Sequence, residues 1–563
     1  MNQETKHRVF VIGFDGATLD LLEPWAQAGL LPTFQRLMTE GSYGPLRSTL
    51  PPMTAPAWTS FMTGKNPGRH GLIDWIRRDE AAYTASPTSG ATCTEPTLWS
   101  ILSRRGRRVC VFNVPMTYPP TPVNGVLIAG LPAPNKHVPL TYPPELQAEL
   151  DDLAGGDYLL YPDPGQAYST SGVEAFLQRL YATTRSRLRV LEALRRRADW
   201  DFLMVVFNGT DTIQHALWRF MDDRHPLHDP VLGQKFGQAI LQFYQHLDNW
   251  LADLLPTLEL DTLVLGMSDH GFGPFHKFIH VNRWLLQEGF LALQQTPRAR
   301  AKAWLFERGF APMPVYNWLM RLGFGALKRE VVRGQGQGLL KTLFLSFDEV
   351  DWARTQAYAL GNIGQIYLNV QGREPLGCVT PGAEYLRVRE AIMRRLGELR
   401  DPATGEKVVE AVYPREALYQ GAQVERLPDI VFLPTRLEYF GFGEFEFGSP
   451  HVIESMQRGI SGTHRMNGLF LAWGPSVKPG SRPVEAGLID LAPTILHALG
   501  EAVPTDMDGR VLHEVFTGAL ADPALVRRCA PDEAQAGNSA EFSSADADAL
   551  RDRLRGLGYV GFN

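Results

Sequence analysis

Six acidic and imidazole side chains stand next to apolar runs of this chain. They are Asp15, Asp211, His215, Asp269, His270 and His464. Asp15 follows the run VFVIGF, and the pair Asp269-His270 follows TLVLGM. Asp211 and His215 have a DxxxH spacing, which places both side chains on one face of a helix, or across a turn and the first helical residue, where they can share a metal. Carboxylate oxygen together with imidazole nitrogen suits zinc and tolerates manganese or iron.

A threonine could supply a nucleophile for the same chemistry. Thr54 lies in the segment PPMTAPAWTSFMTG, after two prolines and before a run able to form a helix. A hydroxyl at a helix N-terminus can attack phosphorus while backbone N–H groups receive the developing charge. Coordination to a metal makes such a hydroxyl a competent nucleophile. Taken alone, Thr54 is better explained as the cap of that helix.

Each of these residues has an ordinary explanation when it is considered singly. Asp15 precedes Gly16, and Asp-Gly is a common turn. His464, before the run GLFLAWG, could be a satisfied surface or core histidine. The set is more informative, because three Asp, three His and one Thr at predicted strand ends could hold two divalent ions about 3.5 to 4 Å apart. The pattern therefore predicts a two-metal hydrolase of phosphate esters.

Short apolar, β-branched runs alternate with helical patterns along most of the chain. The predicted strands cover residues 8–16, 109–115, 125–131, 202–211, 262–271, 429–434 and 468–475. Runs of this kind are typical of strands buried on both faces, and helical patterns cover 174–197, 234–255 and 488–500. The alternation predicts an α/β fold with a doubly wound, mostly parallel sheet. In such sheets ligands bind at the carboxyl ends of the strands, where the polar residues fall.

The region between the Asp269-His270 pair and His464 breaks this alternation. We therefore expect residues 1–289 to form the first part of the core, 290–459 an inserted cap or lid, 460–516 the last part of the core, and 517–563 a linker with a closing helix. The insertion begins with a stretch rich in Trp, Phe and basic residues. Such a stretch can lie on an anionic membrane surface or guide an acidic substrate. A solvated helix face covering the core is the simpler explanation.

The composition is that of an ordinary globular protein, with 44% hydrophobic and 21% charged residues. The formal net charge of -6 gives no basic field, so no nucleic-acid partner is expected. The four cysteines form no CxxC pair, which argues against a disulfide framework and a thiolate zinc site. The N-terminal segment lacks the apolar region of a signal peptide, and no stretch reaches the roughly 18 apolar residues of a membrane span. The expected location is the cytoplasm.

The order and wording of these motifs resemble the alkaline phosphatase superfamily, specifically its type I phosphodiesterase and nucleotide pyrophosphatase branch and the related bacterial predicted phosphohydrolase/phosphomutase group. The similarity covers residues 8–280 and 460–515. It implies an alkaline phosphatase-like core that binds two divalent metal ions, of which Zn²⁺ is the expected one. The implied ligand sets are Asp15, Thr54, Asp269 and His270 for one ion and Asp211, His215 and His464 for the other. It also implies attack by Thr54 on phosphorus and a phosphothreonine intermediate that water hydrolyses.

The resemblance leaves one contact to the phosphoryl group unassigned. Ala57, three residues after Thr54, offers no polar side chain, so another residue must bind the third phosphoryl oxygen. Asn208, Lys277 and Lys65 are the candidates, in that order. Lys277 approaches the site if its loop folds back, but a surface lysine is an equally good explanation.

Other activities are compatible with the same fold. Sulfatases share it, but the segment TAPAW lacks the convertible Cys or Ser and the Arg that they require. We expect a phosphodiester or pyrophosphate substrate rather than a monoester, because no second cationic clamp is evident near Thr54 apart from Lys65 and Arg69. A phosphomutase or phosphotransferase that passes the phosphoryl group to an acceptor, such as a lipid or glycan head group, is the alternative. A binding protein that kept only the fold is disfavoured, because all six ligands and Thr54 are present.

Overall fold

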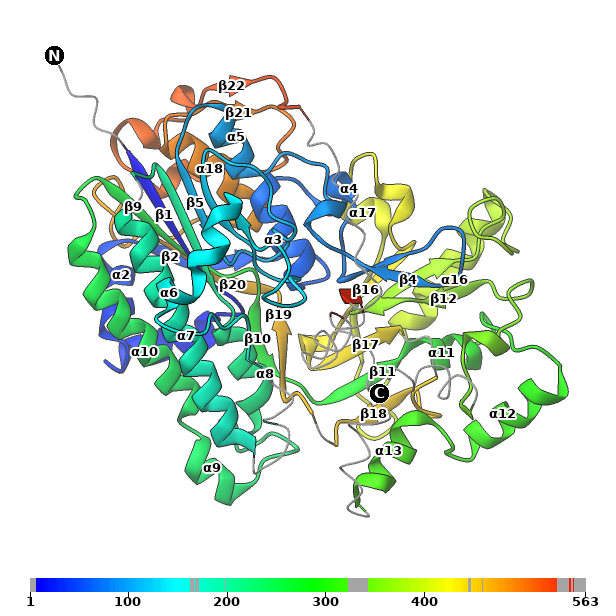
Figure 1. The fold of residues 1–563 in the computed structure, drawn as a ribbon. Helices are drawn as coiled ribbons and strands as arrows, with labels where there is room; N and C mark the ends of the chain where they lie inside the picture. Colours follow the sequence, from blue (N-terminus) through cyan, green and yellow to red (C-terminus); the bar gives the residue numbers. More distant parts are fainter. Residues whose placement is uncertain are drawn as a thin grey trace.

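The computed structural model describes residues 7–162, 167, 172–197, 199–321, 343–443, 447–457, 459–533, 546, 547 and 550. Figure 1 shows two regions, a large sheet flanked by helices and a second region of smaller sheets beside it. The closing helix predicted within 517–563 lies outside the described residues, apart from residues 546, 547 and 550. Within the described chain, no helix has both the length and the apolar character needed to cross a bilayer.

The large sheet has eight strands in the order β2-β20-β9-β1-β8-β5-β6-β7. In that order they are Ser42–Arg47, Asn467–Trp473, Thr262–Met267, Arg8–Phe14, Phe202–Phe207, Val109–Phe112, Gly125–Ile128 and Thr141–Tyr142. The five strands from β9 to β6 run parallel, while β20, β2 and β7 pair antiparallel with their neighbours. The expectation of a doubly wound, mostly parallel sheet is confirmed.

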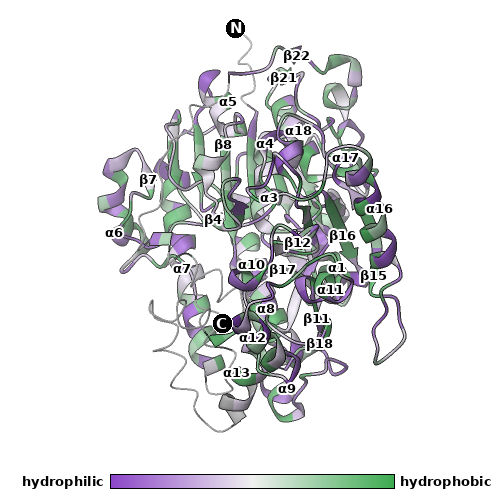
Figure 2. Cartoon of the chain, turned by 90° about the vertical axis from the view of Figure 1, so that its right-hand side faces the viewer, coloured by the Kyte–Doolittle hydropathy of each residue, from purple (hydrophilic) through white to green (hydrophobic). Residues whose placement is uncertain are grey.

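Alternation along the central strand explains why helices cover both faces of this sheet. On β1, Phe10, Ile12 and Phe14 pack into one apolar core, and Val9 and Val11 pack into a second core on the opposite face. The helices that contribute to the first core include α2 (Pro32–Glu40), α7 (Val173–Arg197) and α10 (Ala239–Leu254). Those of the second core include α3 (Thr54–Thr63), α5 (Leu98–Arg104) and α18 (Leu491–Ala498). In Figure 2 the strands are largely green, and helices such as α7 carry both green and purple residues.

The second region, which we call the β11–β18 region, contains two four-stranded sheets with a core of their own. One sheet joins β13 (Gly361–Asn362), β17 (Tyr439–Gly443), β11 (Lys277–His280) and β18 (Ile453–Ser455). The other joins β12 (Ala357–Ala359), β14 (Gln365–Leu368), β16 (Ile430–Pro434) and β15 (Val409–Pro414), with α16 (Ala383–Gly397) packed on it. The predicted strand at 429–434 is therefore an antiparallel strand of this sheet, because an apolar run alone does not specify which sheet it joins. The domain boundaries themselves stay a prediction.

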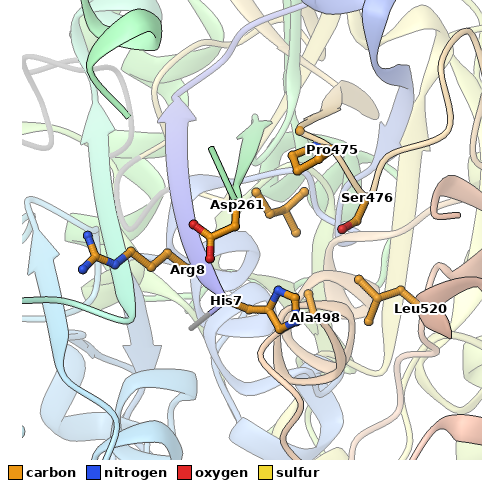
Figure 3. A pocket seen from close by; sticks show the side chains of 9 residues that line it. His7, Arg8, Asp261, Pro475, Ser476, Ala498 and Leu520 are labelled. Carbon is orange, nitrogen blue, oxygen red and sulfur yellow. The ribbon is translucent and has the colours of Figure 1, made fainter. Parts of the chain in front are cut away.

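The segment after Phe516 packs against the body as far as it is described. Strand β21 (Val503–Pro504) pairs parallel with β22 (Arg528–Cys529), and the Arg105 guanidinium lies 3.1 Å from the Asp532 carboxylate. A small pocket opens nearby at the amino end of β1 and β9 (Figure 3). This is the opposite end of those strands from the polar residues singled out by the sequence.

Candidate metal centre and active site

Three neighbouring parallel strands bring the predicted polar residues to one edge of the sheet. In the register of β9, β1 and β8, Gly13 lies beside Met267 and Phe14 beside Phe207. The residues just beyond these strand ends must therefore meet. The Asn208 Nδ2 donates to Asp15 Oδ2 at 2.8 Å, and the Gly16 N–H donates to Asp269 Oδ1 at 3.2 Å.

Gly16 forms the turn after β1 that lets Asp15 and Asp211 lie close together. Its φ of +68° lies in the left-handed region, which glycine adopts without strain. A Cβ here would lie 2.9 Å from the Phe272 ring and 3.3 Å from the Asp211 Cα. The Asp-Gly pair is thus both a turn and the point where Asp15 and Asp211 come together.

Helix α8 (Gly209–Met221) and strand β19 (Gly462–Arg465) supply the next three side chains. As the DxxxH spacing predicted, one turn of α8 places His215 Nε2 3.3 Å from Asp211 Oδ1. Strand β19 pairs antiparallel with β10 (Gly271–Pro274), which follows directly after His270. This pairing places His464 Nε2 3.4 Å from Asp211 Oδ1 and 3.2 Å from His215 Nε2.

Thr54 lies at the first residue of α3, on the rim of the same cluster. Its Oγ1 is 3.4 Å from His270 Nε2, which in turn lies 3.2 Å from Asp269 Oδ2 and 3.7 Å from Asp15 Oδ1. The His270 and His464 rings stack at 3.5 Å between centroids. Figure 1 shows α3, α8 and β19 meeting in the middle of the molecule. All seven residues predicted from the sequence therefore converge at one place.

The three imidazoles are held so that the same ring nitrogen faces inward in each. His215 Nδ1 contacts the Gly462 carbonyl at 2.8 Å, His464 Nδ1 contacts the Pro52 carbonyl at 2.8 Å, and His270 Nδ1 contacts the Gly271 carbonyl at 3.1 Å. A carbonyl only accepts, so each Nδ1 carries the proton. In a neutral ring each Nε2 then presents a lone pair. A backbone carbonyl behind the ring is the usual support of a metal-binding histidine.

The inward-facing atoms form a cluster of acceptors that needs positive charge. Asp15 Oδ1, Asp211 Oδ1 and Asp269 Oδ2 are buried and accept no hydrogen bond in the described structure. Burial, then nearby acids, raise the pKa of Asp15 and bring the pKa of Asp269 to about 8. Burial also lowers the pKa of His270 and His464, so protonated imidazoles are a poor source of that charge. Divalent cations fit this donor set of carboxylate oxygen and imidazole nitrogen.

Two groups of side chains are close enough to hold a cation each. Asp211, His215 and His464 form one group, and Asp15, Asp211 and His270 form the other, in each case with ligand atoms within 4.8 Å of one another. The first group is the second ligand set expected from the sequence. The second contains two members of the other expected set and also Asp211. Asp211 thus lies between the two groups, where it could contact both cations.

Two asparagines that follow neighbouring strands of the large sheet, Asn113 and Asn208, contact each other. Asn208, a predicted substrate contact, donates to Asp15. Asn113, which the sequence reasoning did not single out, donates from Nδ2 to Asn208 Oδ1 at 2.8 Å and to the Val206 carbonyl at 2.6 Å. It lies just after β5 with a φ of +59°. Its signal in the sequence was an Asn that directly follows the buried run VCVF, as Asn208 follows FLMVVF.

The two candidate lysines point their ammonium groups at acids. Lys65 Nζ pairs with Glu95 and Asp506, and Lys277 Nζ pairs with Asp401. The nearby Arg69 Nε lies 2.9 Å from Asp508. Their assignment to substrate binding stays a prediction, and the ion pairs give each of them a structural role.

Comparison with known proteins identifies a family and structures of similar fold. The sequence model of the family described as type I phosphodiesterase / nucleotide pyrophosphatase matches residues 9–442. Phosphonoacetate hydrolase from Sinorhizobium meliloti 1021, solved with phosphonoformate, is 15% identical and has a TM-score of 0.50, over 88% of this chain and 95% of that one. Murine ectonucleotide pyrophosphatase / phosphodiesterase 5, solved as an inactive form with AMP, is 13% identical, with a TM-score of 0.47, over 88% of this chain and 96% of that one. No curated protein sequence matches the chain.

The family match defines a phosphoric ester hydrolase. Because the family match spans well over half of its length, this chain belongs to the type I phosphodiesterase / nucleotide pyrophosphatase family.

Proposed function

We propose that this chain hydrolyses phosphodiesters or pyrophosphates through Thr54, with two divalent cations, Zn²⁺ in the first instance. Asp15, Thr54, Asp269 and His270 would hold one cation, and Asp211, His215 and His464 the other. The observation that carries the proposal is a set of buried carboxylate oxygens that accept no hydrogen bond and face imidazole Nε2 atoms beside one hydroxyl. When bound, the cations would lower the pKa of that hydroxyl and offset negative charge on the phosphoryl oxygens.

Helix α3 prepares Thr54 for attack on phosphorus. Thr54 and Ala55 occupy the first two positions of the helix, and Pro56 follows them. Backbone N–H groups of a first helical turn have no partner within the helix, so they can donate to a phosphoryl oxygen. In the proposed step a bond forms between Thr54 Oγ and phosphorus as the bond to the leaving oxygen breaks. Water then hydrolyses the phosphothreonine and restores the hydroxyl.

Asn208 is the candidate for a further phosphoryl contact. Its side-chain amide carries two hydrogens, one of which goes to Asp15. Asn113 binds the amide oxygen, so the NH₂ group must face the cluster. The second hydrogen is therefore the proposed donor to the third phosphoryl oxygen, the role for which Ala57 has no polar group.

The charge around Thr54 favours a diester over a monoester. Lys65, Lys277 and Arg69 pair with acids, and each such pair reduces the positive charge available to a substrate. A phosphodiester carries one negative charge at phosphorus and a monoester close to two at neutral pH. The site therefore suits the less charged substrate, including the diester of a lipid or other head group.

The test compares hydrolysis of bis-p-nitrophenyl phosphate with that of p-nitrophenyl phosphate by the Zn²⁺-loaded protein. We expect a clear preference for the diester, and a Thr54→Ala variant that loses activity by about a thousandfold or more. Acid-quenched samples analysed by mass spectrometry should carry the nitrophenyl phosphoryl group on the peptide containing Thr54. Preference for the monoester would reverse the substrate assignment, and turnover without Thr54 would overturn the mechanism.

A transferase outcome can be read from the same reaction. If an added alcohol acceptor captures the phosphoryl group in place of water, the product is a new diester and the proposed hydrolysis fails. We expect p-nitrophenyl phosphate and p-nitrophenol as the products of the diester, whether or not the acceptor is present.

A further inference from the structure

Large exposed aromatic side chains gather in one short stretch of the β11–β18 region. In the described part of the chain, the exposed Trp and Phe residues are Trp304, Phe310 and Trp318, which are 56%, 37% and 60% exposed. Leu305 is exposed beside them. Elsewhere among the described residues, exposed large apolar side chains are aliphatic and scattered, such as Val231 and Leu260. Exposed apolar surface rimmed by polar residues marks interaction sites, whereas singly scattered apolar side chains are normal.

Two helices carry this cluster, α12 (Pro297–Glu307) and α13 (Pro312–Arg321). Arg300, Trp304 and Arg308 follow one another at intervals of four residues, so they share one side of α12 and its end. The Arg308 guanidinium lies 3.7 Å from the Trp304 ring centroid. Figure 1 shows both helices along the lower edge of the β11–β18 region, with α12 at the far right and α13 below β18.

The loop between the helices and the first turn of α13 both contact other parts of the protein. The Met313 N–H donates to the Gly448 carbonyl at 3.1 Å, and the Phe310 ring lies 5.0 Å from the Phe344 ring. The exposed rings are therefore presented by an anchored surface. We call Arg300, Trp304, Leu305, Arg308, Phe310 and Trp318 the α12–α13 surface.

The charge on this surface is positive, because the two acids beside it are already paired with other basic residues. Glu307 lies 3.0 Å from Arg283, and Glu349 accepts from Lys302 at 2.6 Å. Arg300 and Arg308 have neutral oxygens as hydrogen-bond partners. Arg300 donates to Gln295 Oε1 at 3.2 Å, and Arg308 donates to the Trp304 carbonyl at 3.2 Å. Two guanidinium groups thus flank an exposed indole without neutralising partners among these contacts.

We propose that the α12–α13 surface docks on the surface of an anionic lipid bilayer. Trp side chains are favoured at the boundary between lipid head groups and acyl chains, where an apolar ring and a polar N–H are both satisfied. Arginines beside them attract anionic head groups. A helix face that only meets water would gain nothing from exposing Trp304 and Trp318. The docking goes beyond the hydrolytic reaction and does not depend on it.

The test is flotation of the full chain with vesicles. One set is phosphatidylcholine alone, and the other contains phosphatidylglycerol as part of the lipid. We expect the protein to float with the anionic set, less so at high salt. Trp304→Ala with Trp318→Ala should lower the partition coefficient by tenfold or more, and Arg300→Gln with Arg308→Gln should abolish the preference for anionic lipid.

Matched controls remove exposed groups elsewhere. The double variant Val231→Ala with Leu260→Ala, and separately Thr54→Ala, should float as the unchanged protein does. The two double variants of the α12–α13 surface should keep their circular dichroism and phosphodiesterase activity on soluble substrate. The proposal is overturned if the protein ignores anionic vesicles, or if the double Trp variant floats equally well. It is also overturned if the Trp substitutions instead abolish self-association in sedimentation velocity or binding to an acidic polypeptide.

Discussion

Two clusters of buried acidic side chains in this molecule differ in how their carboxylates are hydrogen-bonded. In the β11–β18 region, Asp429 accepts from the Leu368 N–H at 2.7 Å, the Tyr385 hydroxyl at 2.8 Å and the Arg373 guanidinium at 2.6 Å. Burial alone would raise the pKa of Asp429, but Arg373 lowers it below its usual range. At the sheet edge, Asp15, Asp211 and Asp269 each keep a buried oxygen that accepts no hydrogen bond.

The difference separates a structural ion pair from a binding site. A satisfied buried carboxylate has its charge balanced within the fold. An unsatisfied one costs free energy unless something outside the chain balances it. We therefore propose that the Asp429 network stabilises the fold and that the sheet-edge cluster binds cations.

Removing the cations should give the largest effect. Chelation, for example with EDTA followed by gel filtration, should lower phosphodiesterase activity by about a thousandfold or more, and added Zn²⁺ should restore it. The melting temperature should fall as well, because a cation that binds only the folded state stabilises it. Unchanged activity in metal-free protein would contradict the proposal that the sheet-edge cluster, unlike the Asp429 network, binds cations.

Asp429→Asn should destabilise the protein by about 3 to 5 kcal/mol, because it leaves buried guanidinium groups without their counter-ion. The measurement is the midpoint of urea unfolding. Cation content per folded molecule should stay the same as in the unchanged protein. A variant that unfolds normally but loses its cations would contradict the assignment.

Asn113→Gly should lower kcat/KM and cation affinity by about tenfold to a hundredfold, since support behind a ligand orients it. Glycine accepts the positive φ of this position, so the backbone can stay in place. The matched control is Glu485→Gly, an exposed residue with a φ of +49°. If Asn113→Gly and Glu485→Gly have the same kcat/KM and cation affinity, Asn113 does not support the cation site.

Asp269→Asn should stabilise the cation-free protein. The expected gain is about 1 kcal/mol for each pKa unit by which the folded state raises the pKa of Asp269 above its value in the unfolded chain. Burial and then Asp211 raise the pKa of Asp269 from 3.8 to about 8, so the folded state holds a proton that the unfolded state has lost. The free energy of unfolding should therefore fall as pH rises from about 4 to about 8 in cation-free protein, and the variant should weaken that slope. The opposite slope is expected for Asp429, but only below about pH 4, because its pKa is lowered in the folded state; calorimetry extended to acid pH therefore distinguishes the two acids.

Lys277→Gln should have the smallest effect on catalysis, about threefold or less in kcat/KM per folded molecule, because Lys277 already pairs with Asp401. The assay is hydrolysis of bis-p-nitrophenyl phosphate with kcat and KM determined separately. A large rise in KM alone would instead place Lys277 at the substrate.

The sequence predicted the parallel sheet and the meeting of the seven residues, because strand ends on one sheet edge are neighbours by construction. It did not predict that the run at 430–434 joins another sheet, because the strand that it pairs with lies far away in the sequence. It also missed Asn113, whose role comes from contact with Asn208 and not from any spacing. Lys65 pairs with Asp506, 441 residues further along the sequence, and Lys277 pairs with Asp401, 124 residues further along. The sequence therefore did not predict these ion pairs.

The most direct test of the cation assignment is anomalous diffraction from crystals of the Zn²⁺-loaded protein, recorded at the zinc absorption edge. Two peaks are expected beside Thr54, one contacted by Asp15, Asp269 and His270 and the other by Asp211, His215 and His464. No peak at this cluster, or peaks held by other side chains, would contradict the account.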